Sequence, residues 1–200
     1  MSDPVLMVVA GCNGSGKSSF SKLLVPADFL PFDYDYYFLK NYQSLFDSEI
    51  REEMAHTITF TELENQIASA LAARSNFCYE TKFNSTPLHW PRLFKQNRYK
   101  LHLIYLCMDS IEEAKRRVAI RVQNGGHYVS EHEIKKRYFE GFANLNAHFE
   151  YFDLIDIFDT SAYSKEPQYI LSIEAGLITP KKRLPKYLVQ LLPEIAKKVQ

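Results

Sequence analysis

Residues 11–18 read Gly-Cys-Asn-Gly-Ser-Gly-Lys-Ser, a complete GxxxxGKS phosphate-binding loop. The apolar run Val5–Ala10 comes directly before this loop and is typical of a strand buried on both faces. Apolar residues at helical spacing follow the loop in Ser19–Leu24. A strand, a glycine-rich loop and a helix in this order direct backbone N–H groups and a helix N-terminus at a phosphate. The sequence therefore predicts that the chain binds a nucleoside triphosphate, ATP in preference to GTP.

The residue types within the loop predict individual roles. Lys17 is expected to reach the β- and γ-phosphates of ATP, and the Ser18 hydroxyl is expected to ligate Mg²⁺. The other residues predicted to bind the nucleotide here are Gly11, Cys12, Asn13, Gly14, Ser15, Gly16 and Ser19. A thiol in an anion-binding loop would have a lowered pKa and could be oxidised, but the preferred interpretation of Cys12 is a small residue that simply fits the loop.

The composition describes a folded globular protein without a strong charge. The chain has 200 residues, of which 46% are hydrophobic, and its 24 Lys and Arg balance its 24 Asp and Glu. This length fits one domain, and a net charge of zero provides no field that would attract nucleic acid or an anionic membrane. No signal-like segment or long apolar run is seen, and the three cysteines (Cys12, Cys78, Cys107) follow no metal-binding spacing. We expect a cytoplasmic protein with reduced cysteines.

Predicted strands and helices alternate along the chain, which favours a parallel sheet covered on both faces. Further strands are expected over 29–33, 76–80, 101–107 and 154–158, and helices over 48–74 (broken near 57–59), 90–95, 109–123 and 130–150. Asp109 with Glu112 and Ser130 with Glu133 have the spacing of capping boxes. The prediction is one domain over 1–200, with a lid at about 115–140 and a C-terminal hairpin and helix over 165–200.

Acidic residues follow two of the predicted strands, at the sheet edge where open α/β sheets place their sites. Asp33 and Asp35 end the second strand, and strand alternation would direct both to one side, toward the acceptor and the γ-phosphate. Glu80 and Thr81 end the third strand, where they could contact the acceptor or, for Glu80, Mg²⁺. The alternative for each is a polar residue that ends a strand and caps a helix.

Arginines near a glycine pair predict a cationic lid. Arg117 and Arg121 are four residues apart, hence on one helix face, and Arg137 lies in the next predicted helix. The break at Gly125-Gly126 between these helices would allow the arginines to approach a nucleotide, where positive charge is needed as phosphoryl transfer proceeds. His127 could contact phosphate or simply complete the loop. A solvated helix surface is the alternative for this region.

These motifs, in this order, resemble the zeta-toxin-like P-loop kinases, in particular a bacterial group described as predicted ATPases. The resemblance covers residues 5 to about 161. It is carried by the phosphate loop, Asp33-Tyr34-Asp35, Tyr79-Glu80-Thr81, the run from Arg117 to His127, Ile134–Tyr138 and Asp159–Ser161. The resemblance implies a three-layer α/β fold with a parallel sheet ordered 2-3-1-4-5 and a helical lid. It also implies that Lys17, Asp35, Arg121 and Arg137 are catalytic, with Asp35 as the general base.

The resemblance implies phosphoryl transfer from ATP to a hydroxyl group of a small molecule. In characterised zeta toxins the acceptor is a UDP-activated amino sugar, so it implies UDP-N-acetylglucosamine as a candidate acceptor and an antitoxin protein as a candidate partner. This chain departs from the group at Lys82–Ser85, where Thr-Leu-Ser-Gly is usual, and in the aromatic run over 34–38. Both segments lie where the acceptor should bind.

Two other functions fit parts of the same pattern. A detoxifying or metabolic small-molecule kinase, similar in outline to chloramphenicol phosphotransferase or gluconate kinase, would use the same aspartates and arginines. A regulatory protein that holds ATP without turnover would need the loop, but it has no need of a positioned base such as Asp35. A transporter-type ATPase is disfavoured, because the chain has no Leu-Ser-Gly-Gly-Gln signature and no apolar strand ending in Asp-Glu.

Overall fold

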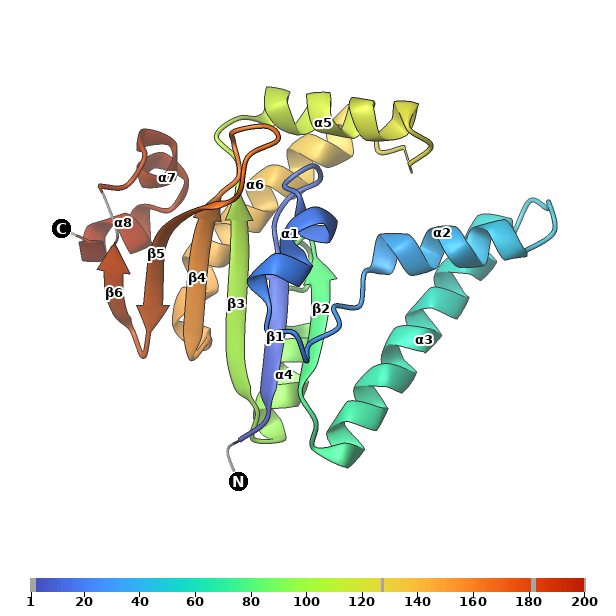
Figure 1. Ribbon diagram of the computed structural model, residues 1–200, viewed down its shortest axis with the longest axis horizontal. Helices are drawn as coiled ribbons and strands as arrows, with labels where there is room; N and C mark the ends of the chain where they lie inside the picture. The colour runs from blue at the N-terminus through green and yellow to red at the C-terminus, as the bar shows by residue number, and fades with distance from the viewer. Residues whose placement is uncertain (1–2, 127, 181–182, 200) are drawn as a thin grey trace.

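The computed structural model describes residues 3–126, 128–180 and 183–199 as an α/β fold built on a mixed sheet (Figure 1). The strands are β1 (Val5–Ala10), β2 (Phe77–Thr81), β3 (Lys100–Cys107), β4 (Leu154–Asp159), β5 (Gln168–Glu174) and β6 (Leu177–Pro180). They lie in the order β2-β1-β3-β4-β5-β6, and β1 to β4 pair in parallel. The last two strands pair antiparallel, which confirms the predicted hairpin.

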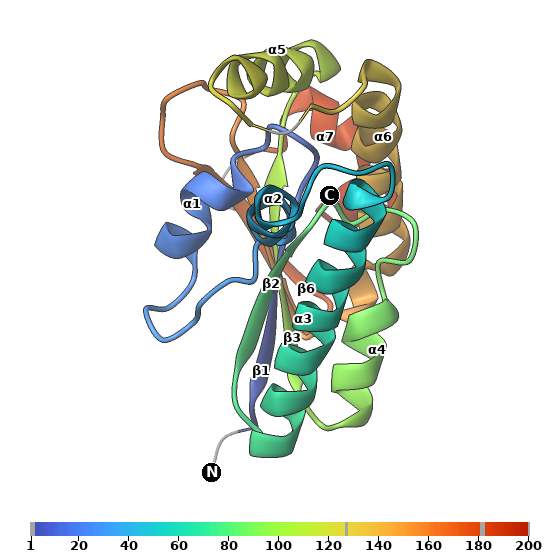
Figure 2. The ribbon, with the colours of Figure 1, turned by 90° about the vertical axis from the view of Figure 1, so that its right-hand side faces the viewer.

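Helices lie on both faces of the sheet, with α1 on one side and α3, α4 and α6 on the other (Figure 2). The helices are α1 (Lys17–Leu24), α2 (Tyr34–Ser44), α3 (Arg51–Ala73), α4 (His89–Gln96), α5 (Ile111–Gln123), α6 (Glu131–His148), α7 (Lys186–Leu191) and α8 (Pro193–Val199), with a short 3₁₀ turn at Phe149–Tyr151. Alternate strand residues build two cores. Leu6, Leu103 and Ile155 belong to the larger one, and Met7 and Ile104 belong to the smaller one beside α1. The sheet face that carries the smaller core is not fully covered, because Leu154, Asp156 and Phe158 of β4 are only partly buried.

The predicted second strand at 29–33 is reduced to one bridge, between Phe32 and Tyr79. The Phe32 N–H donates to the Cys78 carbonyl at 2.9 Å, and the Glu80 N–H donates to the Phe32 carbonyl at 3.0 Å. The chain leaves the sheet immediately afterwards, because Asp33 caps α2. The bridge lies at the outer edge of β2, so counting it as the second strand gives the predicted order 2-3-1-4-5, with β5 and β6 added.

Three local predictions were wrong. The expected break in the helix over 48–74 does not occur, and the hydroxyls of Thr57 and Thr59 bond to the carbonyls four residues earlier within an unbroken α3. Ser110, not Asp109, caps α5 and accepts from the Glu113 N–H. The helix expected after Pro185 is two short helices. The predicted cap at Ser130 is confirmed, since its hydroxyl accepts from the Glu133 N–H.

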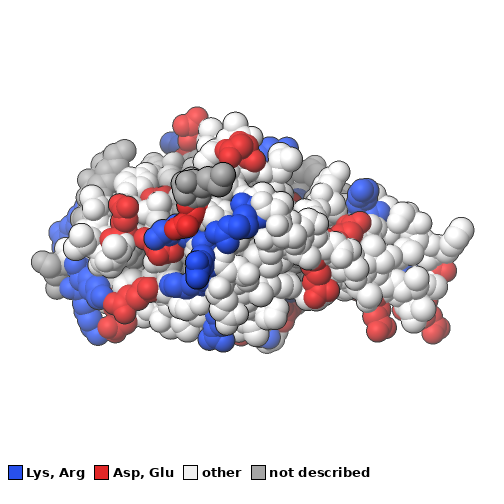
Figure 3. Space-filling model, turned by 90° about the horizontal axis from the view of Figure 1, so that it is seen from below, with Lys and Arg blue, Asp and Glu red and all other residues white. Residues whose placement is uncertain are grey.

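Charged side chains show no dominance of one sign on the face seen in Figure 3, which lies at the end of the molecule away from the phosphate loop. Lys and Arg alternate there with Asp and Glu over a largely uncharged surface. This distribution agrees with the zero net charge of the sequence. Within the described ranges, no helix is long and apolar enough to cross a membrane.

The core around β3 provides a direct test of the fold. Leu103 is fully buried in the central strand, whereas Leu30 is 82% exposed. Leu103→Ala should lower the free energy of unfolding by about 2–5 kcal/mol, because it removes buried apolar contacts and leaves a cavity. Leu30→Ala is the matched control and should change it by less than about 0.5 kcal/mol. Urea unfolding measures both, and equal effects would contradict the burial of β3.

Candidate active site

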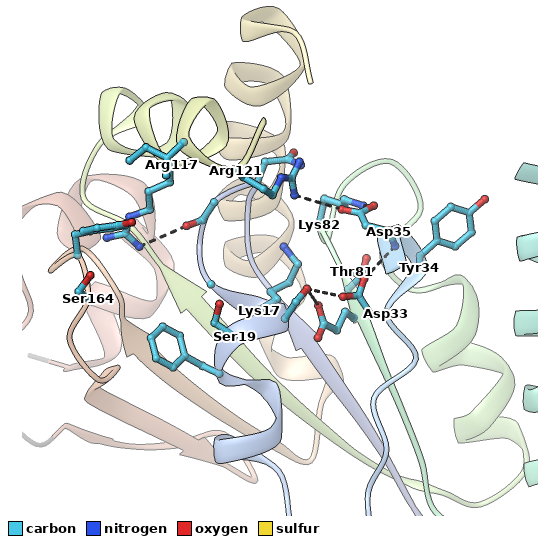
Figure 4. Close-up of a pocket in the computed structure, with 18 of the residues that line it drawn as sticks. Lys17, Ser19, Asp33, Tyr34, Asp35, Thr81, Lys82, Arg117, Arg121 and Ser164 are labelled. Atoms are coloured by element: carbon cyan, nitrogen blue, oxygen red, sulfur yellow. Dashed lines mark hydrogen bonds and ion pairs between the residues drawn. The ribbon is translucent and has the colours of Figure 1, made fainter. Parts of the chain in front are cut away.

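The register of the parallel strands brings the functional segments to one edge of the sheet. β1 lies between β2 and β3, with Ala10 opposite Thr81 on one side and Tyr105 on the other. The phosphate loop therefore leaves the sheet level with Glu80 and Thr81. A cavity of about 390 Å³ opens at this edge, lined by the phosphate loop, the start of α2, the end of β2, helix α5 and the loop after β4 (Figure 4).

The phosphate loop wraps so closely that it requires glycine. A Cβ atom at Gly11 would lie 2.6 Å from the Leu106 carbonyl oxygen, and a Cβ atom at Gly16 would lie 2.8 Å from the Phe20 ring. Gly16 also has a φ of 85°, in the left-handed region, where it forms the N-terminal boundary of α1. The loop side chains Asn13 and Ser15 are buried. Lys17, Ser18 and Ser19 at the start of α1 line the cavity.

Lys17 reaches back across its own loop. Its Nζ donates to the carbonyls of Gly11 at 2.7 Å and Cys12 at 3.0 Å, which uses two of its three N–H donors. Burial lowers the pKa of Lys17, and the nearby Lys82 lowers it further. Burial also raises the pKa of Cys12 to about 11, although Lys17 opposes this shift. Of the two interpretations of Cys12, the raised pKa favours a small residue that fits the loop over a reactive thiol, because desolvation outweighs the neighbouring positive charge.

Ser18 meets both carboxylates that follow the predicted strands. Its hydroxyl oxygen lies 2.6 Å from Asp33 Oδ2 and 3.0 Å from Glu80 Oε2. The other oxygen of Asp33 accepts from the N–H groups of Asp35 and Tyr36 at the start of α2. Asp33 and Asp35 therefore do not alternate along a strand as predicted, since they are the cap and a first-turn residue of a helix. Asp33 points to Ser18, and Asp35 points elsewhere.

The oxygen atoms around Ser18 fit a Mg²⁺ ion. A hydroxyl has one proton and can donate to only one of the two carboxylates at a time. Burial raises the pKa of Glu80, and repulsion from Asp33 raises it further, so a cation would relieve an unfavourable arrangement. In the described part of the chain, no group of three or more His, Cys, Asp or Glu side chains could hold a metal. Magnesium commonly uses one or two carboxylates together with substrate phosphates, so this set is sufficient.

Asp35 is held between two cations. Its Oδ1 lies 2.6 Å from Lys82 Nζ, and its Oδ2 lies 3.8 Å from Arg121 Nη1 (Figure 4). Burial alone would raise the pKa of Asp35, but the ion pair and hydrogen bond with Lys82 outweigh it and bring the pKa to about 2. Sequence reasoning assigned no role to Lys82. The signal was its position directly after Glu80-Thr81, where the chain departs from the group that it resembles.

Thr81 lines the cavity and also forms a local hydrogen bond. Its hydroxyl accepts from the Phe83 N–H at 3.1 Å, and Phe83 has a φ of 58°. This bond supports the turn that carries Lys82 from the end of β2 toward Asp35. Thr81 thus helps to shape the part of the cavity that the sequence assigned to the acceptor.

The three predicted arginines occupy different positions. Arg117 is tied to protein groups, since it bonds to Glu113 and to the carbonyls of Gly14, Thr160 and Ser161. It joins α5 to the phosphate loop and to the loop after β4. Arg121 lies beside Asp35. Arg137 pairs with Glu133 and donates to the Asn13 side chain at 3.3 Å, which ties α6 to the phosphate loop. His127 lies outside the described residues.

The loop after β4 forms a wall of the cavity that sequence reasoning did not identify. Tyr163, Ser164 and Lys165 line it, and the Tyr163 ring lies against the Arg116 guanidinium at 4.5 Å. The motif Asp159–Ser161 immediately before these residues was the available signal. Its Ser161 hydroxyl accepts from the Asp109 N–H, so the motif fixes this loop against the end of β3.

Comparisons with known proteins agree with this fold. The sequence model of the zeta toxin family matches residues 1–165. No curated protein sequence matches the chain significantly. A solved complex of AvrRxo1-ORF1 and AvrRxo1-ORF2 with sulphate ions has a TM-score of 0.71 at 14% identity, covering 97% of this chain and 64% of that chain. The same pair with ATP gives a TM-score of 0.66, with the same identity and coverage.

A third solved structure, from the PezAT chromosomal toxin–antitoxin system of Streptococcus pneumoniae, has a TM-score of 0.60 at 14% identity. It covers 97% of this chain and 78% of that chain. At such low identity these likenesses establish the fold. This chain spans 64% of the length of the AvrRxo1 chain that it matches.

The ion pair between Lys82 and Asp35 leads to a prediction about pH. Lys82→Met removes the main cause of the low pKa of Asp35, so burial should raise that pKa from about 2 to or above the ordinary carboxyl value. In the parent chain the pair stabilises the fold fully above the ordinary carboxyl pKa, and this contribution is lost as pH falls toward about 2. Titration of ¹³C-labelled aspartate carboxyl groups by NMR measures the shift, with Asp35→Asn identifying the resonance. Lys40→Met, on the helix that carries Asp35, is the control and should leave the titration of Asp35 unchanged. An unmoved Asp35 resonance in Lys82→Met would contradict the ion pair.

Proposed function

The chain belongs to the zeta toxin family, and on that premise we propose that it is a kinase that transfers the γ-phosphoryl group of ATP to a hydroxyl group of a small molecule. The observation that carries this proposal is that one cavity is lined by the phosphate loop, the Ser18 site with its two carboxylates, and Asp35. Nucleotide, metal and acceptor base would then be within reach of one another. We also propose that residues 1–200 act as one kinase domain, with a lid over about 115–140.

On the nucleotide side, the backbone N–H groups of the loop and the start of α1 would bind the β-phosphate. The N–H donor of Lys17 that its own loop leaves unused would bind a γ-phosphate oxygen. Ser18 and Glu80 would hold Mg²⁺, with Asp33 close enough to bond to its water ligands, and the ion supplies charge neutralisation when bound. Gly11 to Ser19 would thus remain the nucleotide-binding segment predicted from the sequence.

On the acceptor side, Asp35 would accept a hydrogen bond from the attacking hydroxyl and take its proton as the new oxygen–phosphorus bond forms, while the bond from the γ-phosphorus to the bridging oxygen breaks and ADP leaves. Arg121, beside Asp35, would neutralise charge that builds on the transferred group. Arg137, bound to Asn13 of the loop, would do the same from α6. Arg117 would act by fixing the lid to the nucleotide loops, because its donors are directed at protein carbonyls.

UDP-N-acetylglucosamine is the acceptor that family membership favours, and a detoxifying or metabolic acceptor is the alternative that the same residues would serve. The PezAT structure is described as a toxin–antitoxin system. We therefore also propose an antitoxin protein as a partner of this chain. A protein that only binds ATP is the least favoured function, because Asp35 is held ionised in the cavity, where a pure nucleotide binder has no use for it.

Two variants separate nucleotide binding from the base role. Lys17→Ala should remove most turnover and weaken ATP binding strongly. Asp35→Ala should lower kcat by about 10²–10⁴-fold while leaving ATP binding nearly unchanged, because Asp35 would act on the acceptor. Calorimetric titration with ATP and steady-state kinetics measure the two effects. Lys40→Ala, an exposed change on α2, is the control, and near-normal turnover in Asp35→Ala would refute the base assignment.

The acceptor is tested by ³¹P NMR of the purified protein with ATP, Mg²⁺ and UDP-N-acetylglucosamine. A new sugar-phosphate resonance should appear, and it should be absent with Lys17→Ala and with Asp35→Ala. If ATP stays intact or yields only ADP and free phosphate, this acceptor is excluded. A panel of hydroxyl-bearing metabolites then tests the alternative kinase function, and failure of the whole panel with intact ATP binding would favour the regulatory function.

A further inference from the structure

Helix α3 carries large apolar side chains on the side that faces away from the rest of the molecule. Its packed face consists of buried residues at helical spacing: Ala55, Thr59, Leu63, Ile67 and Ala70. Ile50 at the start of the helix, Met54 and Ile58 follow one another at intervals of four residues on the outer side. They are 56%, 41% and 36% exposed, and Phe46 in the preceding loop is 95% exposed. These four residues are called the outer stripe below.

Uncharged residues continue the same side of the helix beyond the outer stripe. From Ile50 to Ala72, all of which the structure describes, the exposed residues on this side are Met54, Thr57, Ile58, Thr61, Asn65, Ala68 and Ala72. The hydroxyls of Thr57 and Thr61 donate to backbone carbonyls four residues earlier, so their protons are already used. The exposed face of a helix normally carries charged residues. A side without them that begins with large apolar side chains is typical of a surface that a partner covers.

The outer stripe is held on a rigid support apart from the candidate active site. α2 and the adjoining end of α3 project together from the sheet (Figure 1). The side chain of Asn41 on α2 donates to the Thr59 hydroxyl at 3.1 Å and to the Glu62 carboxylate at 3.2 Å, which fixes the two helices to each other. Among the described residues, none from α3 lines the cavity at the phosphate loop. A partner could therefore cover a preformed surface without entering that cavity.

Acidic residues surround the outer stripe. Residues 45–73 contain six acidic residues and one basic residue, although the whole chain has a net charge of zero. The basic residue, Arg51, is engaged within the protein: its Nε donates to the Tyr42 carbonyl at 2.8 Å, and its guanidinium lies 4.2 Å from the centre of the Tyr42 ring. Its Nη1 also lies 3.6 Å from Asp47 Oδ1. Three exposed glutamates have no ion-pair partner among the described residues: Glu52, Glu53 and Glu64.

This charge distinguishes between two kinds of partner. A second copy of the chain would bring an equally acidic segment against this one. In an antiparallel pair related by a two-fold axis, Glu53 and Glu64 would face the same two residues of the other copy, and like charges would repel. A helix that carries Lys or Arg beside its apolar residues would instead place positive charge next to these glutamates. Complementary charge therefore favours a basic partner over self-association.

We propose that the outer stripe is the docking surface for a partner protein, which contacts it through an amphipathic helix whose apolar residues are flanked by Lys and Arg. The apolar residues of that helix would pack between Ile50, Met54 and Ile58, whose four-residue spacing forms a ridge along α3. Its basic residues would pair with Glu53 and Glu64 at the rim. This interaction goes beyond the proposed kinase function and does not depend on it, because the surface shares no residue with the cavity among the residues described.

A displayed library of helical peptides tests this surface without assuming a partner sequence. The purified full chain selects the binders, and fluorescence anisotropy measures the dissociation constants of the enriched peptides. These peptides should carry an excess of Lys and Arg beside apolar residues at helical spacing. Met54→Gln combined with Ile58→Gln should raise their dissociation constants about tenfold or more, because two apolar contacts are lost while helix propensity is nearly kept. Leu30→Gln, which changes an exposed leucine outside α3, is the matched control and should have no effect.

A second pair of substitutions tests the charge. Glu53→Gln combined with Glu64→Gln should weaken peptide binding several-fold at low salt. The same pair should have a smaller effect at high salt, because screening already reduces the attraction in the parent chain. An equal effect at both salt concentrations, or none, would contradict the role of these glutamates.

The other outcomes separate this surface from its alternatives. A selection that enriches no peptide, or peptides that bind the Met54→Gln and Ile58→Gln variant as tightly as the parent, would overturn the docking surface. Enriched peptides without an excess of Lys and Arg would overturn the basic class of partner. Dimerisation in sedimentation velocity that Ile58→Gln abolishes would show that a second copy occupies the stripe instead. Thermal melting and calorimetric titration with ATP should give parent-like results for the double variant, which checks that it is folded.

Discussion

The arrangement of the site depends on the parallel pairing of β1 between β2 and β3. This register places Val9 opposite Glu80 and Ala10 opposite Thr81, so the phosphate loop and the end of β2 leave the sheet at the same level. A shift of one residue would turn Glu80 to the opposite face of the sheet and remove it from Ser18. The buried apolar residues of β1 and β3 fix the register from both faces. The same strand register therefore determines both the packing of the core and the position of the Glu80 carboxylate.

Charge is arranged in two opposed groups across the cavity. Asp33 and Glu80 gather at Ser18, while Lys82 and Arg121 surround Asp35 and Lys17 lies across its loop. The first group is unfavourable by itself, as the raised pKa of Glu80 indicates. A nucleotide with a divalent cation would supply the positive charge that this group needs and the negative charge that Lys17 needs. The protein alone is thus electrostatically incomplete, which is typical of a site built for a charged ligand pair.

Much of this arrangement could be predicted from local sequence, because the signals were local. The phosphate loop is contiguous, β3 is a mainly apolar run, and Ser130 with Glu133 forms its cap within one turn. The helix over 34–44 was missed, since its aromatic residues favour strands, and its start is set by Asp33, whose carboxylate accepts from the N–H groups of Asp35 and Tyr36. The pairing of Lys82 with Asp35 spans 47 residues and depends on how the sheet edge turns. No pattern within one segment encodes such a contact.

The low pKa of Asp35 constrains how this residue would act as the proposed base. A carboxylate with a pKa of about 2 is a weak base, so it would not deprotonate a hydroxyl to any large extent before the phosphoryl group moves. Phosphoryl transfer with a loose transition state needs little prior deprotonation, and it depends more on alignment of the attacking oxygen. Lys82 and Arg121 keep Asp35 ionised, and the hydrogen bond from Lys82 fixes Oδ1, which suits a group that orients a hydroxyl by accepting its hydrogen bond. Lys82 therefore lowers the basicity of Asp35 and at the same time holds it in position. The hydroxyl proton would transfer late, once the new oxygen–phosphorus bond has made it acidic.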